Sequence, residues 1–438
     1  MHAASASSKL TNDDGIKWQS PEENQSSPND PQTAVRSIIT EYDRSTERSE
    51  FADVLGGLSA DSWDELAAGR LYSSASWLRF CAADVGGRTT TGAVHVSGTA
   101  GAAAVSVTAV QDETNAFYQW HTQLTERGLP SPDPVGILVG QRRGYQTHLL
   151  TSGDVSPESA ASALLDRLDH LRADVVGSGI LPSVTGGSTP CVAGFLGTRD
   201  VLALRAAGVP ALPVLLTTDA WIPVGPGGWA QWLQSLPSKG RRDSVKQEIK
   251  AFARAGYQIR RSPLSECYRE AAELLAATQR RYGHPYDLDV LAESFRRQAI
   301  AMGSAAQVLF CARQGESAVA FCLYYIFGDT LFVRAVGFDY PQLRGAAEYF
   351  NLVYYEPVRI AADHGLSWLH LGIESADAKA LRGARLRPLW LLDLAQDSVL
   401  VDHSDQIRVH NTTALRQLRD SSSAVAKALD ADLYRPFC

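Results

Sequence analysis

A strand, hairpin and helix pattern in the second half of the chain limits the fold more than any other feature. Two apolar runs and a third strand, which follows a Gly328-Asp329 turn, lie within residues 307–336. A helical pattern over residues 346–364 and an apolar segment at residues 368–371 come next. This order requires a mixed sheet with helical cover and a right-handed strand–helix–strand crossover. We therefore predict an α/β fold.

The length of 438 residues favours two domains. Residues 1–35 are rich in Ser, Asn, Asp, Gln and Pro and predict a disordered tail, before a strand at residues 35–42. Proline and glycine residues near Trp221 indicate a boundary between units at 36–220 and 221–438. Further helices are predicted at residues 59–80, 115–127, 157–173, 198–207, 229–236, 241–256, 267–282 and 376–382, and strands at 92–109, 138–139, 146–150 and 211–217.

Bulk composition excludes several classes of protein. The net charge of −7 argues against a protein coated in nucleic acid, so we expect no DNA partner. Six scattered cysteines without a C-x-x-C pair suggest neither a disulfide framework nor a metal site. The chain has no secretory h-region and no run of about 18 apolar residues, so we expect a cytoplasmic protein without a membrane span.

The turn before the 346–364 helix is the first candidate site. It contains Gln342, Arg344, Gly345 and Ala347, and a turn that opens a helix presents unpaired N–H groups to an anion. The pattern resembles the pyrophosphate loop of the GNAT acyltransferases, which implies that these residues bind the donor. An ordinary helix start has the same pattern, so that interpretation stays open.

The segment after the strand at 368–371 is the second candidate. Glu374 follows the strand end, and Lys379 and Arg382 are three residues apart on the next short helix. This run resembles the C-terminal part of the Fem-like acyltransferases. The resemblance implies that Lys379 stabilises the oxyanion and that Glu374 accepts a proton from an attacking amine. The alternatives are a surface helix with a basic pair, and a Glu374 that is only a structural partner of Arg382.

A basic segment before the 241–256 helix is the third candidate. It resembles a Leu-Ser-x-Lys-x-Arg segment of the same family, and it contributes four donor-binding candidates: Lys239, Arg241, Arg242 and Lys246. Helical spacing places Arg242, Lys246, Lys250 and Arg254 in one stripe, which suits the phosphates of an RNA or of coenzyme A. The alternative is a solvated helix face.

Aromatic and charged residues complete the predicted cleft. We expect five side chains to line it: Arg334, Tyr324, Tyr355, Glu356 and Arg382. Pro357 removes a backbone donor and should distort the long helix near Val353. In the first half, Tyr118, Trp120 and Tyr145 are candidates for an acceptor wall.

The resemblance is strongest over residues 235–388 and implies two tandem GNAT-like domains, the first degenerate. It further implies an acyl-group transferase without a tightly bound cofactor, whose co-substrate is aminoacyl-tRNA or, less favoured, acyl-CoA. Because we identify no coiled-coil arm, we expect a small-molecule amine or hydroxyl(amine) acceptor, as in antibiotic or specialised metabolite biosynthesis. Two alternatives remain: an acyl-CoA-dependent N-acetyltransferase and a non-catalytic GNAT-like recognition protein.

Overall fold

The computed structural model describes residues 51–438 apart from residues 52, 85, 99–100, 184–187 and 285. The predicted tail at residues 1–35 and the predicted strand at residues 35–42 lie outside this part of the chain.

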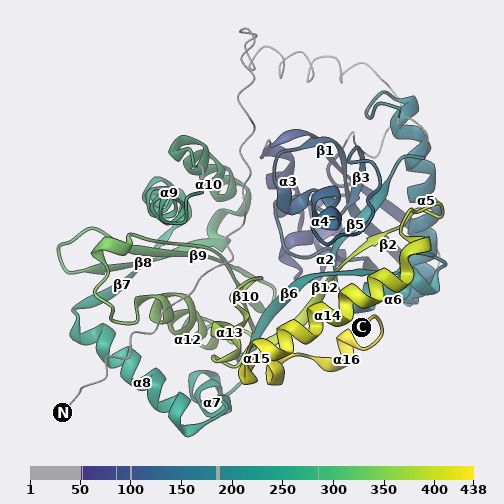
Figure 1. Cartoon of the computed structure of the whole chain (residues 1–438). Coiled ribbons are helices and arrows are strands. Elements are labelled where there is room, and N and C mark those ends of the chain that lie inside the picture. Colours follow the sequence, from purple (N-terminus) through teal and green to yellow (C-terminus); the bar gives the residue numbers. More distant parts are fainter. Residues whose placement is uncertain (1–50, 52, 85, 99–100, 184–187, 285) are drawn as a thin grey trace.

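Within the described residues, twelve strands form one mixed sheet, which runs through the molecule (Figure 1). Its hydrogen-bonded order is β1-β2-β3-β5-β12-β6-β11-β10-β9-β8-β7, and β4 pairs with β2. The β3–β5 and β10–β11 pairs are parallel, and the other strand pairs are antiparallel. The strands are β1 (Gly87–Gly98), β2 (Gly101–Glu113), β3 (Gly136–Val139), β4 (Leu150–Gly153), β5 (Cys191–Leu196), β6 (Val214–Pro223), β7 (Tyr257–Pro263), β8 (Ala306–Arg313), β9 (Ala320–Phe327), β10 (Thr330–Phe338), β11 (Trp368–His370) and β12 (Arg385–Asp393).

Strand β12 joins the two halves of the sheet. It comes late in the chain, yet it lies between β5 and β6 and pairs antiparallel with both. Strand β6 then pairs with β11, so the first and second halves share one hydrogen-bonded ladder. Trp221, near the predicted domain boundary, lies inside β6. The division into units 36–220 and 221–438 stays a prediction.

Helices cover both faces of this sheet. In the second half, α3, α9 and α10 pack on one face, and α7, α8 and α12 pack on the other (Figure 1). The helices are α2 (Ala60–Ala67), α3 (Ala75–Ala83), α4 (Trp120–Thr125), α5 (Pro157–Gly177), α6 (Thr198–Ala206), α7 (Gly228–Ser235), α8 (Lys239–Arg254), α9 (Leu264–Arg281), α10 (Leu288–Met302), α11 (Glu348–Phe350), α12 (Glu356–Asp363), α13 (Ala376–Ala380), α14 (Ser404–Ser421), α15 (Ser423–Ala428) and α16 (Ala431–Tyr434).

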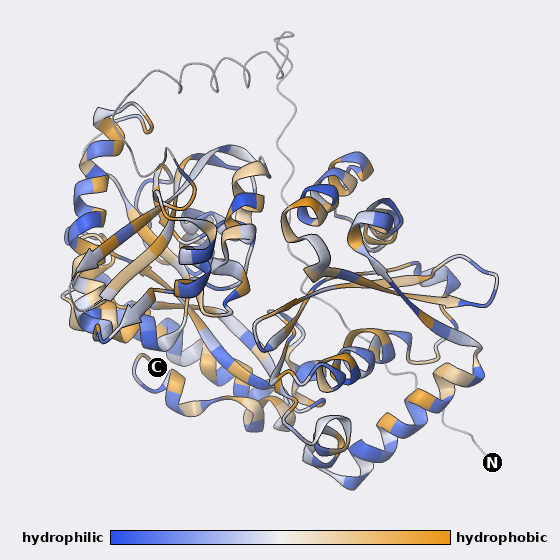
Figure 2. Ribbon diagram, turned by 180° about the vertical axis from the view of Figure 1, so that it is seen from behind, coloured by the Kyte–Doolittle hydropathy of each residue, from blue (hydrophilic) through white to orange (hydrophobic). Residues whose placement is uncertain are grey.

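Hydropathy follows this layering. Figure 2 shows apolar residues concentrated in the central strands and hydrophilic residues on the outer sides of the helices. Adjacent residues of β9 illustrate the alternation, because Tyr324 belongs to the core under α12 and Tyr325 to the core under α9 and α10.

The predicted mixed α/β sheet is confirmed, including the β9–β10 hairpin and its connection through a helix to β11. The predicted distortion near Val353 is also present, as a π-helical turn over Asn351–Tyr355. It ends two residues before Pro357, which has no N–H for the Val353 carbonyl.

Other predictions were incomplete or wrong. Of the strand predicted at residues 146–150, only Leu150 lies in a strand, as the first residue of β4, and Thr147 makes an isolated bridge to Leu196. The helix predicted at 115–127 is reduced to a 3-10 turn and the short α4. Strands β5, β7 and β12 were not predicted, because strand formation depends strongly on tertiary neighbours. Helices α10 and α14 were also not predicted, although α10 buries residues at helical spacing.

A buried ion pair stabilises the first half. Arg142 donates through Nε to Glu113 Oε2 at 2.6 Å and through Nη2 to Glu113 Oε1 at 2.8 Å. The side chains are 0% and 3% exposed. Arg142 also donates to the Asp84 carbonyl, so the pair connects the end of β2 to the end of α3. A buried guanidinium needs such a partner, because water is not there to solvate it.

We predict that Glu113→Ala lowers the free energy of unfolding by roughly 3–5 kcal/mol, because it leaves the Arg142 charge buried and unpaired. Urea denaturation monitored by circular dichroism measures this. The matched control is Glu270→Ala, which breaks the exposed Arg260–Glu270 pair and should cost less than about 1 kcal/mol. Equal losses in both variants would contradict the role of burial.

Candidate functional site

The turn after β11 holds an unusual backbone conformation. Gly372, Glu374 and Ser375 have φ values of 67°, 66° and 51°. A side chain at position 372 would meet the ring of Tyr145, because a Cβ there would lie 3.2 Å from it. Left-handed non-glycine residues cost about 1–3 kcal/mol each and concentrate at functional sites. Two such residues in succession mark this turn as a candidate site.

Lys379 reaches back from α13 into this turn. The residue is 5% exposed, and its Nζ donates to the carbonyl of Gly372 at 3.0 Å and to the carbonyl of Ile373. Burial lowers the pKa of Lys379 to about 7, against the attraction of Asp219 and Glu374, which raises it. Both protonation states are therefore populated near neutral pH, which suits a group that donates and accepts protons.

Lys379 and Arg382 do not form the exposed basic pair of the alternative interpretation. Both are buried, and they have different partners. Arg382 donates through Nη2 to Glu248 of α8, at 2.9 Å from Oε2 and 3.1 Å from Oε1. Glu374 is exposed at the strained turn, and its role as proton acceptor stays a prediction.

Asp219 of β6 forms a polar network that the sequence analysis missed. Its carboxylate accepts from Gln146 Nε2 at 2.6 Å and from Trp221 Nε1 at 2.7 Å, and it lies 2.6 Å from His370 Nε2. Burial opposes the charge, but His370 and these hydrogen bonds lower the pKa of Asp219. The only signal in the sequence is that Asp219 and His370 interrupt apolar strands.

Arg334 approaches the same turn from β10. Its Nη1 donates to the hydroxyl of Tyr145 at 2.7 Å, and its Nη2 donates to the carbonyl of Arg143 at 3.0 Å. The guanidinium also stacks on the Tyr145 ring at 5.0 Å. Because the Tyr145 ring also borders Gly372, this tyrosine connects Arg334 to the turn that Lys379 binds.

The other predicted cleft residues lie elsewhere. Tyr355 donates to Glu248, which also binds Arg382, under α8 and α12. Tyr324 belongs to the same core, and Glu356 pairs with Arg359 on α12 at 3.2 Å. Arg334, in contrast, contacts Trp77 and Tyr145 and lies on the α3, α9 and α10 side. The predicted cleft set is thus divided between two faces of the sheet.

The turn predicted to bind the donor pyrophosphate is filled by a side chain of the protein. Gly345 and Ala347 have φ values of 67° and 61°, as an open amide turn requires. However, the N–H groups of Arg344 and Ala346 each donate at 2.8 Å to the carboxylate of Glu348, which is 3% exposed. Gln342 lies exposed in the 3-10 turn before them. The donor-binding role of the turn stays a prediction.

The basic stripe lies on α8. Lys239, Lys246 and Lys250 are exposed, and Arg241 and Arg242 are partly buried. Arg242 donates to the Leu236 carbonyl at 3.0 Å, so part of its capacity is used by the protein. The stripe is joined to the candidate site through Glu248, the residue of α8 that pairs with Arg382.

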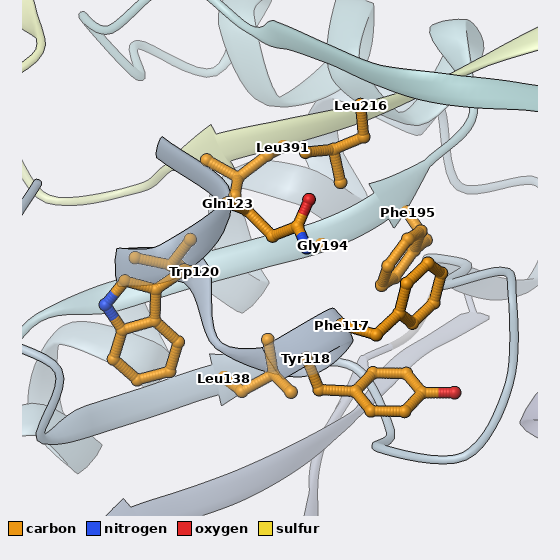
Figure 3. Close-up of a pocket in the computed structure, with 10 residues that line it drawn as sticks. Phe117, Tyr118, Trp120, Gln123, Leu138, Gly194, Phe195, Leu216 and Leu391 are labelled. Atoms are coloured by element: carbon orange, nitrogen blue, oxygen red, sulfur yellow. The ribbon is translucent and has the colours of Figure 1, made fainter. Parts of the chain in front are cut away.

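A small apolar pocket lies in the first half (Figure 3). The predicted acceptor-wall residues Tyr118 and Trp120 line it. Phe117 and Phe195 stack at 4.8 Å on one side of it, and Phe117 lies 6.0 Å from the ring of Tyr145. One aromatic ring therefore separates the pocket from the Lys379 turn.

In the part of the chain that the structure describes, no helix has the length and hydropathy of a transmembrane segment.

We predict that Lys379 makes stability depend on pH. Its pKa falls from 10.5 to about 7 on folding, so the unfolded chain binds more protons between these values and stability rises with pH across this window. The measurement is urea unfolding from pH 7 to 9 for wild type and Lys379→Met. The wild-type free energy of unfolding should rise more steeply with pH, and parallel curves would contradict the prediction.

Comparisons with known proteins agree with the resemblance in the sequence. The family model FemAB-like, described as peptidoglycan biosynthesis/recognition, matches residues 210–424. None of the curated proteins matches the chain. The structure of FemX is similar over 78% of this chain and 96% of its own, with a TM-score of 0.50 and 11% identity.

Two further solved structures are similar at lower scores. A conserved protein of unknown function from Bacteroides thetaiotaomicron covers 77% of this chain and 98% of its own, with a TM-score of 0.46 and 11% identity. L-PGS from Bacillus licheniformis covers 66% and 91%, with a TM-score of 0.39 and 13% identity. The FemX likeness concerns the fold, and it is consistent with tandem GNAT-like domains. Over residues 210–424, the chain is similar to the FemAB-like family, and its fold is similar to that of FemX.

Proposed function

We propose that this acyltransferase moves an aminoacyl group from aminoacyl-tRNA to the amine or hydroxyl(amine) of a small molecule. The observation that carries the proposal is Lys379, a buried lysine whose Nζ binds only backbone carbonyls among its hydrogen-bond partners in the described chain. It projects into a strained turn at the junction of β6 and β11. No covalent enzyme intermediate is required.

The transfer proceeds by direct attack. The acceptor nitrogen forms a bond to the ester carbonyl carbon, and the bond from that carbon to the ribose oxygen breaks. Glu374 takes the proton from the attacking amine. The Lys379 ammonium stabilises the oxyanion and supplies a proton to the departing ribose oxygen, a role that suits its pKa of about 7. Binding both substrates at one turn supplies much of the remaining rate.

The choice of donor follows from Glu348. Its carboxylate takes the two amides that a coenzyme A pyrophosphate would need, at 2.8 Å each. A pyrophosphate would have to displace a buried anion that has already satisfied these donors. The exposed stripe of Lys239, Lys246 and Lys250 offers phosphate contacts spread over α8, which suits an RNA better than coenzyme A.

The acceptor is proposed to be small. The apolar pocket next to Tyr145 is small, and aromatic side chains line much of it. Its aromatic rim would contact an apolar part of the acceptor while the nucleophile reaches the Lys379 turn. Such a reaction fits antibiotic or specialised metabolite biosynthesis.

We predict that the full chain retains charged tRNA on filters and does not retain radiolabelled acetyl-CoA. Reversing three charges of α8 (Lys239→Glu, Arg242→Glu, Lys246→Glu) should abolish tRNA retention, because phosphate contacts dominate such binding. The matched control reverses Arg408, Arg416 and Arg419, which are exposed on α14, and should retain tRNA. Saturable binding of acetyl-CoA alone would establish the acyl-CoA-dependent alternative.

We also predict that Lys379→Ala lowers the transfer rate by about 10²–10³-fold, the loss typical of an oxyanion-stabilising donor. Circular dichroism should report an unchanged fold. The matched control is Lys427→Ala, an exposed lysine of α15, which should keep full activity. Unchanged biological function of the Lys379 variant would instead support a non-catalytic recognition protein.

A further inference from the structure

The buried arginines of this protein differ in their partners. Arg142 and Arg382 have side chains that are 0% and 2% exposed, and each binds both oxygens of a carboxylate. These two charges are neutralised inside the protein, as burial requires. A third arginine, Arg334, differs from these two in its hydrogen-bond partners.

Arg334 binds neutral groups instead. Its hydrogen bonds go to a phenol, at Tyr145, and to a peptide carbonyl, at Arg143. No ion pair between Arg334 and a carboxylate is present among the described residues, and its Nε is shielded from solvent without a hydrogen-bond partner. The residue as a whole is nevertheless only partly buried. A shielded cation with neutral partners favours an external anion.

Other polar groups without a hydrogen-bond partner belong to the aromatic cluster that Arg334 contacts. Tyr72 Oη, Trp77 Nε1 and His370 Nδ1 are all shielded and, within the described chain, have no hydrogen-bond partner. All three residues are 0% exposed. The Tyr72 ring lies 5.1 Å from Trp77 and 5.9 Å from His370, and the Arg334 guanidinium lies 5.8 Å from the Trp77 ring. Indole and guanidinium N–H groups only donate, so their missing partner is an acceptor.

The same cluster adjoins the reacting centre. The Tyr145 ring packs edge-to-face on Tyr72 at 5.8 Å and borders Gly372, whose carbonyl binds Lys379. A ligand group held by Arg334 would thus be one tyrosine ring away from the turn that carries Lys379.

We propose that Arg334, together with Tyr72 and Trp77, forms a subsite for an oxyanion of the substrate, a carboxylate or a phosphate. The inference rests on the proposed function of the Lys379 turn and adds the substrate class: one of the two substrates carries an anionic group near its reacting atom. Arg334 is a binding residue for that group, and Tyr72 and Trp77 supply further donors to the same oxygens.

The test measures anion binding without any transfer reaction. The melting temperature of the full chain is recorded in sodium acetate, in sodium phosphate and in sodium chloride at matched ionic strength. Acetate or phosphate should raise the wild-type melting temperature above the chloride value, because a ligand that binds the folded state stabilises it. The anion that acts at lower concentration distinguishes a carboxylate from a phosphate.

Variants assign the effect to Arg334. Arg334→Gln should abolish the anion-dependent rise, whereas Arg382→Gln should lower the melting temperature in chloride and keep the rise, since it strands Glu248 but leaves the subsite intact. The α8 triple reversal should also keep the rise, which separates this subsite from tRNA binding. A wild-type protein without a rise, or an equal rise in Arg334→Gln, would overturn the proposal.

Tyr72→Phe provides a second, conservative variant in case Arg334→Gln does not fold. It removes a buried hydroxyl that lacks a partner, so its melting temperature in chloride should equal or exceed that of wild type. Its anion-dependent rise should be smaller than that of wild type, and an undiminished rise would contradict the subsite.

If anions bind through Arg334 but no transfer occurs, the subsite stands and the proposed function fails. Transfer with an unchanged KM in Arg334→Gln would refute the link to the substrate.

Discussion

The insertion of β12 between β5 and β6 is the constraint on which the rest of the structure depends. A strand in the interior of a sheet satisfies its backbone groups on both sides, and β12 does so with strands of the first half. Strand β6 then continues the ladder to β11 of the second half. The two halves are therefore held by main-chain hydrogen bonds, and the candidate site lies on this junction.

The junction brings together groups that would otherwise be far apart. Asp219 comes from β6 and His370 from β11, 151 residues later, and they meet at 2.6 Å. Just beyond His370, the Gly372 carbonyl accepts from the Ala220 N–H of β6 and from Lys379. Regular pairing thus holds one side of the strained turn in place, which explains how two left-handed non-glycine residues persist there.

Electrostatics divides the charged residues of the protein into two kinds. Arg142 and Arg382 are neutralised by carboxylates, and the Glu348 carboxylate is satisfied by backbone amides. These groups stabilise the fold and have little capacity left for a ligand. Lys379 and Arg334 bind neutral oxygens, so they retain the capacity to stabilise an additional negative charge. The capacity for chemistry therefore lies at Lys379 and Arg334, close to the turn after β11.

The sequence alone determined the elements with strong local signals. The hairpin of β9 and β10, the amphipathic α8 and the distortion before Pro357 follow from turn chemistry, helical periodicity and a missing N–H group. The resemblance also predicted a catalytic role for Lys379, but the sequence did not reveal that this residue is buried. Only the tertiary structure decided that β12 returns to the first half, that Glu348 fills the amide turn, and that Arg334 has no carboxylate partner among the described residues. Each of these depends on which distant residues meet across the sheet, and local periodicity carries no information about such meetings.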